Sequence, residues 1–419
     1  MKIVLVNYRY FFSGGPERYM FNIKELLEAE GHEVIPFSVQ HNKNVKTPYA
    51  KYFLSPIGTG DEIYADQVKK NIPNIIKGIG RVVYSFEAKT RFRKLLEEVK
   101  PDIIYILCVQ SKISYSIVDV AASLHIPVVH RISDFSLLCP SDHYYRSDIN
   151  AICEDCTKKG LYSAVLHRCN HGSLLSSIVK AASLNVERFI GVKEKISHFV
   201  FTTEHTRKKF IEGGFDTNKL SVIPTMFNDS TLNRDLQISY KPYALFVGRI
   251  DPDKGIKTLL DAFIGSQYNL KLIGFSSTGY IQELQKHLEG KQHNIEFLGR
   301  MDFEQIQKYL AECMFTIIPS MWYDNLPNSI LESYALRKCV VATKVGCFLD
   351  NVHDGKSGLL FDYNDSESLK SCINMLFNNE SMAIRMGEYG RTLIDTTYNE
   401  KIHVNKLVSL FEKVVKNNS

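Results

Sequence analysis

Two cations share a short loop in the second half of the chain. Arg249 and Lys254 lie between the apolar run Tyr243–Val247 and Gly255. Arginine can bind a diphosphate through two parallel donors, and lysine contributes a compact point charge. We therefore expect this loop to bind a diphosphate, and the alternative is a group of solvated surface charges.

An acidic pair follows a later apolar run, Phe315–Ile318. Asp324 and Glu332 are separated by seven residues. Between them, Asn325 and Pro327 favour the start of a helix, whose free N–H groups attract phosphate or a developing anion. Glu332 beside an apolar helix face needs polar partners, which ribose hydroxyls would supply. The alternative for Glu332 is an exposed helix glutamate.

A third loop with chemical potential lies near the N-terminus. Gly14 and Gly15 follow the apolar segment Lys2–Tyr8 and precede Pro16. Glycines let the backbone approach a phosphate or a sugar, and the helix that begins here offers free N–H groups. The loop lacks the Gly-x-Gly-x-x-Gly pattern and a Walker lysine, so an ordinary strand-to-helix turn is the alternative.

Expected strands and helices alternate along the chain and must position these loops. In the first half, strands are expected at Lys2–Tyr8 and Glu33–Val39, with the helix Pro16–Ala29 between them. The alternation restarts near residue 243 and predicts parallel sheets with helices on both faces. The predicted fold class is α/β, with two doubly wound, Rossmann-like lobes that face each other across a cleft.

The polar stretch Asn228–Lys241 is the expected linker between the lobes. We place the N-terminal lobe at residues 1–227 and the C-terminal lobe at residues 228–419, with the last helices as candidates to pack back on the first lobe. Doubly wound sheets bind ligands at the carboxyl ends of their strands. The three loops are therefore expected to line the cleft.

The order of these motifs resembles that of the retaining glycosyltransferases of family 4, which have the GT-B fold. The resemblance covers nearly the whole chain. It implies transfer of a sugar from a nucleotide-diphosphate donor to a glycan or lipid-linked acceptor, without a catalytic metal, in bacterial surface-polysaccharide biosynthesis. It rests on Gly14-Gly15, Arg249 with Lys254-Gly255, Asp324 with Glu332, Val341-Ala342-Thr343, and Asp354-Gly355 with Gly358-Leu359-Leu360.

For the donor nucleotide, the resemblance implies a separate role for each site residue. Arg249 and Lys254 would hold the diphosphate and stabilise the charge of the departing group, and Glu332 would bind the ribose. Gly14 and Gly15 would lie near the diphosphate. Two fixed cations and helix-end N–H groups would then replace a metal ion as the clamp on the leaving group.

For the donor sugar and the base, other residues are implied. Asp324, with the backbone around Asn325 and Leu326, would bind sugar hydroxyls. The segment Gly299-Arg300 would approach the base. Asp324 stands where the family usually has glutamate, one methylene longer, which could shift its reach by about 1 Å and matter for positioning.

The sequence also departs from the family on the acceptor side. Many relatives carry a His-Asp pair where this chain has Ser133 and Asp134. We predict Asp134 as a cleft residue with a catalytic role, and we assign no such role to His130. Arg337 replaces a usual glycine after the acidic helix, and Asp350 is the counterpart of a usual glutamate.

Four cysteines lie close together in the first half of the chain and include a Cys-x2-Cys pair: Cys139, Cys153, Cys156 and Cys169. This spacing lets two thiolates face one ion and predicts a structural zinc site in an inserted segment, residues 139–170. The alternatives are an iron–sulfur cluster, substitution by His143, His167 or His171, and four reduced thiols. We expect the insertion to shape the acceptor site.

Composition and patterning set the expected cellular setting. Hydrophobic residues make up 44% and charged residues 23% of the chain, which is ordinary for a soluble globular protein. No secretory signal or membrane-spanning run is apparent, so a cytoplasmic location is expected. Residues 77–94 mix basic and apolar residues like an amphipathic helix that contacts anionic lipid at the inner face of the plasma membrane. An ordinary helix of the lobe is the alternative.

Two other classes of protein are compatible with parts of the sequence. One is another GT-B enzyme, such as a nucleotide-sugar epimerase or a phosphorylase, and an epimerase could use Arg249, Lys254 and Glu332 nearly as well. A zinc-containing nucleic-acid-binding protein could use the cysteines and the basic segment. The net charge of only +5 and the lack of an aromatic-basic ribonucleoprotein motif argue against nucleic acid.

Overall fold

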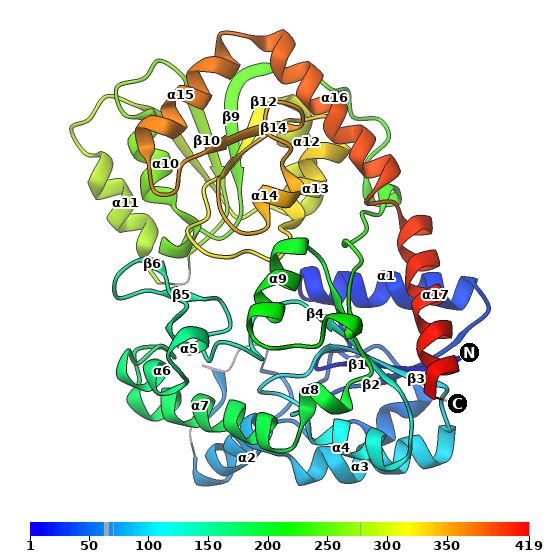
Figure 1. Ribbon diagram of the computed structural model, residues 1–419. Helices are drawn as coiled ribbons and strands as arrows, with labels where there is room; N and C mark the ends of the chain where they lie inside the picture. Colours follow the sequence, from blue (N-terminus) through cyan, green and yellow to red (C-terminus); the bar gives the residue numbers. More distant parts are fainter. Residues whose placement is uncertain (63–66, 70, 277, 419) are drawn as a thin grey trace.

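A computed structural model describes residues 1–62, 67–69, 71–276 and 278–418 (Figure 1). The first half contains a parallel sheet in the order β2-β1-β3-β4-β7-β8. Its apolar strands suit a sheet that is buried on both faces. They are β1 (Lys2–Asn7), β2 (Glu33–Phe37), β3 (Ile103–Cys108), β4 (Val128–Ile132), β7 (His198–Phe201) and β8 (Leu220–Val222).

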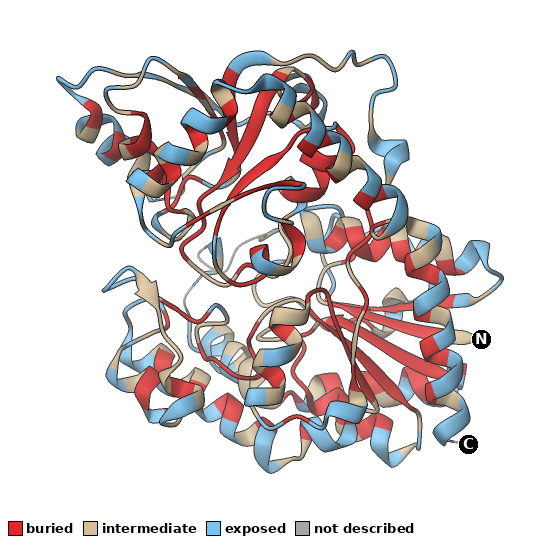
Figure 2. Cartoon of the chain, turned by 45° about the horizontal axis from the view of Figure 1, so that its top comes forward, coloured by how far each residue is buried: buried red, intermediate tan, exposed pale blue. Residues whose placement is uncertain are grey.

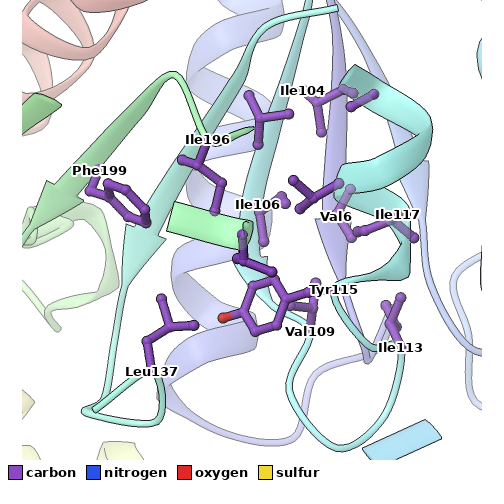
Figure 3. Close-up of a cluster of buried hydrophobic side chains, with 14 of the residues drawn as sticks. Val6, Ile104, Ile106, Val109, Ile113, Tyr115, Ile117, Leu137, Ile196 and Phe199 are labelled. Carbon is purple, nitrogen blue, oxygen red and sulfur yellow. The ribbon is translucent and has the colours of Figure 1, made fainter. Parts of the chain in front are cut away.

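Helices cover both faces of the first sheet. Side chains alternate across the strands, so Val4 and Val6 join one apolar cluster while Ile3 and Leu5 join the other. Figure 2 shows the buried strands between the helices, and Figure 3 shows part of the first cluster. The helices are α1 (Gly15–Ala29), α2 (Ile72–Val83), α3 (Phe86–Val99), α4 (Ser116–Ser123), α7 (Leu174–Phe189), α8 (Val192–Lys195) and α9 (Glu204–Glu212).

The inserted segment forms small elements between β4 and α7. They are the hairpin of β5 (Tyr145–Arg146) and β6 (Ala151–Ile152), then α5 (Asp155–Lys158) and α6 (Tyr162–Leu166). Cys156 and Ala164 pack with residues of α7 in a separate apolar cluster. The insertion therefore has a small core of its own.

The second half repeats the parallel architecture in the order β11-β10-β9-β12-β13-β14. The strands are β9 (Lys241–Val247), β10 (Asn269–Ile273), β11 (Asn294–Gly299), β12 (Cys313–Ile318), β13 (Val340–Thr343) and β14 (Gly358–Phe361). The helices are α10 (Ile256–Phe263), α11 (Tyr280–Leu288), α12 (Phe303–Glu312), α13 (Asn328–Ala335), α14 (Phe348–Asn351), α15 (Ser366–Phe377), α16 (Glu380–Thr396) and α17 (Glu400–Asn418).

The strand order reverses beside the first strand of each sheet, between β1 and β3 and between β9 and β12. Such switch points are where doubly wound sheets bind ligands. The loops after β1, β9 and β12 lie at these switch points. They are the same three loops that the sequence identified for chemistry.

The last helix, α17, returns to the first domain. Leu407 and Phe411 pack into the core beside β1 and β3, and the Phe411 ring lies 5.1 Å from that of Tyr105. His403 Nε2 lies 2.9 Å from the Tyr19 hydroxyl, and His403 Nδ1 lies 2.7 Å from the Pro224 carbonyl. Figure 1 shows α17, in red, beside α1 and close to both termini.

The basic segment 77–94 does not form one amphipathic helix, so the prediction of a single helix is wrong, and contact with anionic lipid stays a prediction. The chain breaks between α2 and α3, where the Ser85 hydroxyl accepts a hydrogen bond from the Ala88 N–H and caps α3. Phe92 is fully buried, whereas Ile79 and Phe86 are exposed. Among the described helices, none combines the length and the apolar character that a membrane crossing requires.

Candidate active site

The loop after β9 reaches the loop after β12 through a tight turn. Residues Pro252–Lys254 form a 3-10 turn that ends at Gly255, where φ is +66°. A Cβ atom on Gly255 would lie 1.9 Å from the Pro319 carbonyl oxygen. Only glycine permits this approach, which brings Lys254 next to the acidic loop.

Lys254 and the buried Asp324 form an ion pair that is largely shielded from solvent. The Lys254 Nζ lies 2.9 Å from both carboxylate oxygens of Asp324. The Ser320 hydroxyl donates a 2.6 Å hydrogen bond to the same carboxylate, and the ammonium lies 4.8 Å from the Trp322 ring centre. The structure thus pairs Asp324 with Lys254 and fixes both side chains before any ligand binds.

Arg249 is held more loosely. Its guanidinium donates to Asp251 and, at 2.9 Å, to Asp253 of its own loop. Half of the Arg249 side chain is exposed. Exposed ion pairs are weak, so a diphosphate can compete for this cation at low energetic cost.

Glu332 links the two domains from the buried face of α13. Its carboxylate lies 3.4 Å from the guanidinium of Arg18 on α1. Burial raises the pKa of Glu332, and the Arg18 charge opposes that shift. Sequence reasoning identified Glu332 but missed Arg18, because no local pattern marks a partner 314 positions away.

A cavity of about 190 Å³ lies between the domains beside Glu332. Gly15 lines it from the first domain, and Asn325 and Leu326 line it from the second. A Cβ on Gly15 would lie 2.9 Å from the Asn328 side chain, so this glycine keeps the domains close. Gly14 is the extended residue that precedes α1.

Asn325 connects the acidic loop to the first domain. Its side-chain oxygen accepts hydrogen bonds from Thr202 at 2.5 Å and from Thr206 at 3.2 Å. Its side-chain nitrogen donates to the Ile132 carbonyl at 3.2 Å. Asn325 therefore positions the start of α13 against β4 and α9. No pattern in the sequence around Asn325 predicted these contacts.

Gly299 and Arg300 lie at the end of β11, beside the loop after β10. The Gly274 N–H donates to the Gly299 carbonyl at 2.9 Å, and a Cβ on Gly274 would lie 1.8 Å from the Gly248 carbonyl oxygen. The Arg300 guanidinium lies 5.0 Å from the Phe275 ring centre. Gly274 and Phe275 were not predicted from the sequence, although a glycine directly after a strand is a usable signal.

Asp134 lies in the turn after β4. Its carboxylate accepts a 2.9 Å hydrogen bond from the Ser136 N–H. The neighbouring Ser133 lines the interdomain cavity and accepts a 2.6 Å hydrogen bond from Arg131. His130 is buried beside the Tyr115 hydroxyl, and burial lowers the pKa of His130 to about 4. Arg131 also lines the cavity, and the sequence did not predict it as a site residue.

The four cysteines of the insertion are free thiols in one neighbourhood. Cys139 contacts Cys156 and Ser141, and these contacts lower the pKa of the Cys139 thiol. Among the described residues, the group whose ligand atoms all lie within 4.8 Å of one another is Cys153, Asp155 and His167. Cys169 packs against the small core of the insertion.

The insertion also contacts the acidic loop of the second domain. The Tyr323 hydroxyl donates a 2.8 Å hydrogen bond to Glu154, which lies between Cys153 and Cys156. Lys209 lies 2.8 Å from the same carboxylate. The insertion therefore braces the residue that precedes Asp324. Sequence reasoning placed the insertion on the acceptor side and missed this contact.

Two facing Rossmann-like domains define the GT-B fold class, and the predicted fold is confirmed. Sucrose-phosphate synthase from Thermosynechococcus elongatus has this fold over 99% of both chains, with a TM-score of 0.69 and 16% identity. HepE from Anabaena, solved with UDP and glucose, aligns over 99% of this chain and 100% of its own, with a TM-score of 0.62 and 17% identity. At such identities the likeness shows the fold alone.

Residues 230–393 match the family model described as Glycosyl transferases group 1. An uncharacterized glycosyltransferase of Methanocaldococcus jannaschii is 32% identical over 187 residues, which are 44% of this chain and 52% of the relative. The capsular polysaccharide biosynthesis glycosyltransferase CapM of Staphylococcus aureus is 22% identical over 262 residues, 57% of this chain and 64% of the relative. The chain spans about half the length of the curated relatives it matches. These comparisons support the group 1 glycosyltransferase family.

Proposed function

We propose that the protein is a glycosyltransferase that moves a sugar from a nucleotide-diphosphate donor to a glycan or lipid-linked acceptor. The central supporting observation is the interdomain cavity, where Gly15 of one domain meets Asn325, Leu326 and Glu332 of the other. The family match lies in the second domain, which is the proposed donor domain. The matches to a glycosyltransferase of capsular polysaccharide biosynthesis and to an O-antigen chain mannosyltransferase support a role in polysaccharide biosynthesis.

In the proposed mechanism, cations of the second domain clamp the diphosphate. Arg249 would exchange its loop carboxylates for phosphate oxygens, while Lys254 would face the diphosphate from its pair with Asp324. As the bond from the sugar to the diphosphate breaks, negative charge grows on the leaving phosphate. The Lys254 charge, already held in place by Asp324, stabilises that charge without reorganisation. This is the basis for proposing catalysis that needs no divalent metal.

Other residues of the cleft would bind the rest of the donor. The Glu332 carboxylate would accept hydrogen bonds from ribose hydroxyls, and Gly14 and Gly15 would let the backbone approach the diphosphate. Gly299 and Arg300 would flank the base near Phe275, where a flat ring has a stacking partner. The base would accordingly lie away from the ion pairs of Arg249 and Lys254.

The proposed reaction retains the configuration of the sugar, as in the family that the motifs resemble. Asp134 directly follows Ser133, which lines the cavity, and its proposed role is to contact an acceptor or sugar hydroxyl. The anomeric proton of the product, measured by NMR, tests this proposal. Product with inverted configuration would exclude it.

A nucleotide-sugar epimerase could use the same donor clamp. The two functions differ in their need for a second substrate. We expect nucleoside diphosphate to be released together with glycoside formation only when an acceptor is present. Release of the diphosphate with an altered free sugar and no acceptor would favour the epimerase.

We further propose that the insertion binds a structural zinc ion through Cys139, Cys153, Cys156 and Cys169. The thiol contact of Cys139 with Cys156 supports a shared site, and His167 beside Cys153 is a substitute ligand. Metal chelation is then expected to lower the melting temperature, and elemental analysis to give one zinc per chain. The control is chelator treatment of a Cys139→Ser/Cys153→Ser variant. Metal-free protein with unchanged melting under chelation would contradict the proposal.

A further inference from the structure

A second and larger cavity, of about 760 Å³, lies within the first domain. It occupies the carboxyl ends of β1, β2 and β3, where Arg9, His41 and Lys112 line it from three successive loops. The insertion closes another side with Asp142 and His143. This is the usual ligand-binding edge of a parallel sheet, and the proposed donor clamp does not use it.

One lysine of the cavity, Lys112, is partly buried without a carboxylate partner among the described residues. Lys112 forms no side-chain hydrogen bond or ion pair with the described part of the chain, and burial, Arg9 and Lys180 all lower its pKa. Lys180 has Asp142 at 3.5 Å as its partner. Ser111, next to Lys112, has a left-handed φ of +59°, which costs free energy in a non-glycine residue. A partly buried lysine among other cations is stabilised by an anion.

A short chain of ring contacts joins this cavity to the donor clamp. His143 lines the cavity, and its ring lies 4.5 Å from the ring of Trp322. The Lys254 ammonium of the donor clamp lies 4.8 Å from the centre of the same Trp322 ring. A molecule in the cavity would therefore have one end near the proposed diphosphate site.

Helices α2 and α7 form part of the cavity wall and also carry exposed apolar residues. Helices α2 and α7 pack side by side at the base of the first domain in Figure 1. Ile72, Ile76 and Ile79 of α2 are 74%, 65% and 44% exposed, at helical spacing that places them on one face. Leu175 of α7 is 71% exposed. Ile75, half exposed, also lines the cavity.

Exposed apolar residues that gather on neighbouring helices mark a binding surface. We propose that the cavity and this surface together bind one amphiphilic acceptor, with a phosphate-type anionic head at Lys112 and a hydrocarbon chain along α2 and α7. This inference rests on the proposed function and specifies the class of its acceptor. A bilayer surface could cover the isoleucines, but it would not reach a lysine inside a cavity, so the observations favour a single molecule.

The sole tryptophan, Trp322, offers a direct readout, because it touches the cavity wall at His143. Geranylgeranyl diphosphate is titrated below its micelle concentration while Trp322 fluorescence is followed, with no donor present. Geranylgeraniol and inorganic diphosphate are titrated as separate arms. We expect the amphiphile to bind about tenfold or more tightly than either fragment, since each contributes only part of the contact.

Variants separate the head from the chain. Lys112→Ala is expected to weaken binding of geranylgeranyl diphosphate about tenfold through the lost charge contact. Ile72→Ser/Ile76→Ser is expected to weaken it by a similar factor through lost apolar contact. Lys286→Ala and Met375→Ser, at exposed positions of the second domain, are the matched controls and are expected to bind normally. Unchanged melting temperatures would show that all variants fold.

The outcomes distinguish this inference from the proposed function. Equal binding of the amphiphile and its fragments, or wild-type binding by the Lys112 and isoleucine variants, would overturn the inference. The inference would also be overturned if the isoleucine variant bound geranylgeranyl diphosphate normally and lost only its sedimentation with phosphatidylglycerol vesicles. That result would assign the apolar surface to a bilayer. Failure of the proposed function appears elsewhere, as absence of nucleoside diphosphate binding in calorimetry, and leaves the amphiphile result unchanged.

Discussion

At the scale of single residues, the two cations of the β9 loop differ in how they are held. The Lys254 side chain is only 16% exposed and is paired with the buried Asp324, whereas Arg249 is half exposed and paired within its own loop. A buried pair is costly to break, because the remaining charge stays desolvated. An exposed pair contributes little to stability. The same loop thus contains a fixed charge and an adaptable one.

This difference predicts contrasting variants. Lys254→Ala should lower the free energy of unfolding by about 3 kcal/mol, because the buried Asp324 loses its partner, and should lower kcat by roughly 100-fold or more. Arg249→Ala should lower activity while leaving stability within about 1 kcal/mol of the wild type. Urea unfolding and donor-dependent kinetics measure both effects. Equal stability losses in the two variants would contradict the assignment.

The raised pKa of Glu332 predicts a pH-dependent contribution to stability. Folding favours the neutral carboxyl, so ionisation costs stability as pH rises from 4.5, the ordinary value, through the raised pKa. Relative to Glu332→Gln, the wild type should therefore lose stability over that window and show a constant difference above it. Urea unfolding from pH 4 to pH 8 tests this. A relative gain of the wild type with rising pH would be incompatible with it, and exposed Glu304→Gln serves as the control.

At the scale of elements, one turn determines where Lys254 lies. Gly255 combines a positive φ with a contact that leaves no room for a Cβ atom. Gly265 has a similar φ of +72° but has open space around it. A comparison of substitutions at the two glycines therefore separates the cost of backbone strain from the cost of a steric clash.

We expect Gly255→Ala to cost clearly more than Gly265→Ala. The control should lose about 1 kcal/mol from strain alone. Gly255→Ala adds the clash with Pro319 and displaces Lys254 from Asp324, so donor-dependent activity should also fall. Thermal unfolding and kinetics of both variants measure the difference. Similar losses, with activity retained, would show that the close approach does not position Lys254.

The alternation of elements was enough to predict two Rossmann-like domains and the loops at the ends of their strands, because periodicity and strand order follow from local patterns. The partners of those loops were not predictable. Arg18 with Glu332, Thr202 with Asn325, and Glu154 with Tyr323 join positions more than 100 residues apart. Such pairs depend on how the two domains pack, and no spacing within one element encodes that packing.

At the scale of the molecule, α17 ties the end of the chain to the core of the first domain. Phe411 is fully buried there. We expect Phe411→Ala to lower the free energy of unfolding by about 3–5 kcal/mol. Phe189→Ala, at a position that is 90% exposed, should change it little and is the control. Comparable effects of the two variants in urea unfolding would mean that α17 contributes no packing to the first domain.

The whole account depends on one nucleotide that contacts both cations and Glu332 between the domains. The most direct measurement is the melting temperature of the wild type, Arg249→Ala, Lys254→Ala and Glu332→Gln with and without saturating UDP, GDP or ADP. At 100 times Kd, a ligand adds about 2.7 kcal/mol to stability. The account predicts a clear rise for the wild type with at least one nucleotide and a smaller rise in each variant. No rise with any nucleotide, or an equal rise in all four proteins, would contradict it.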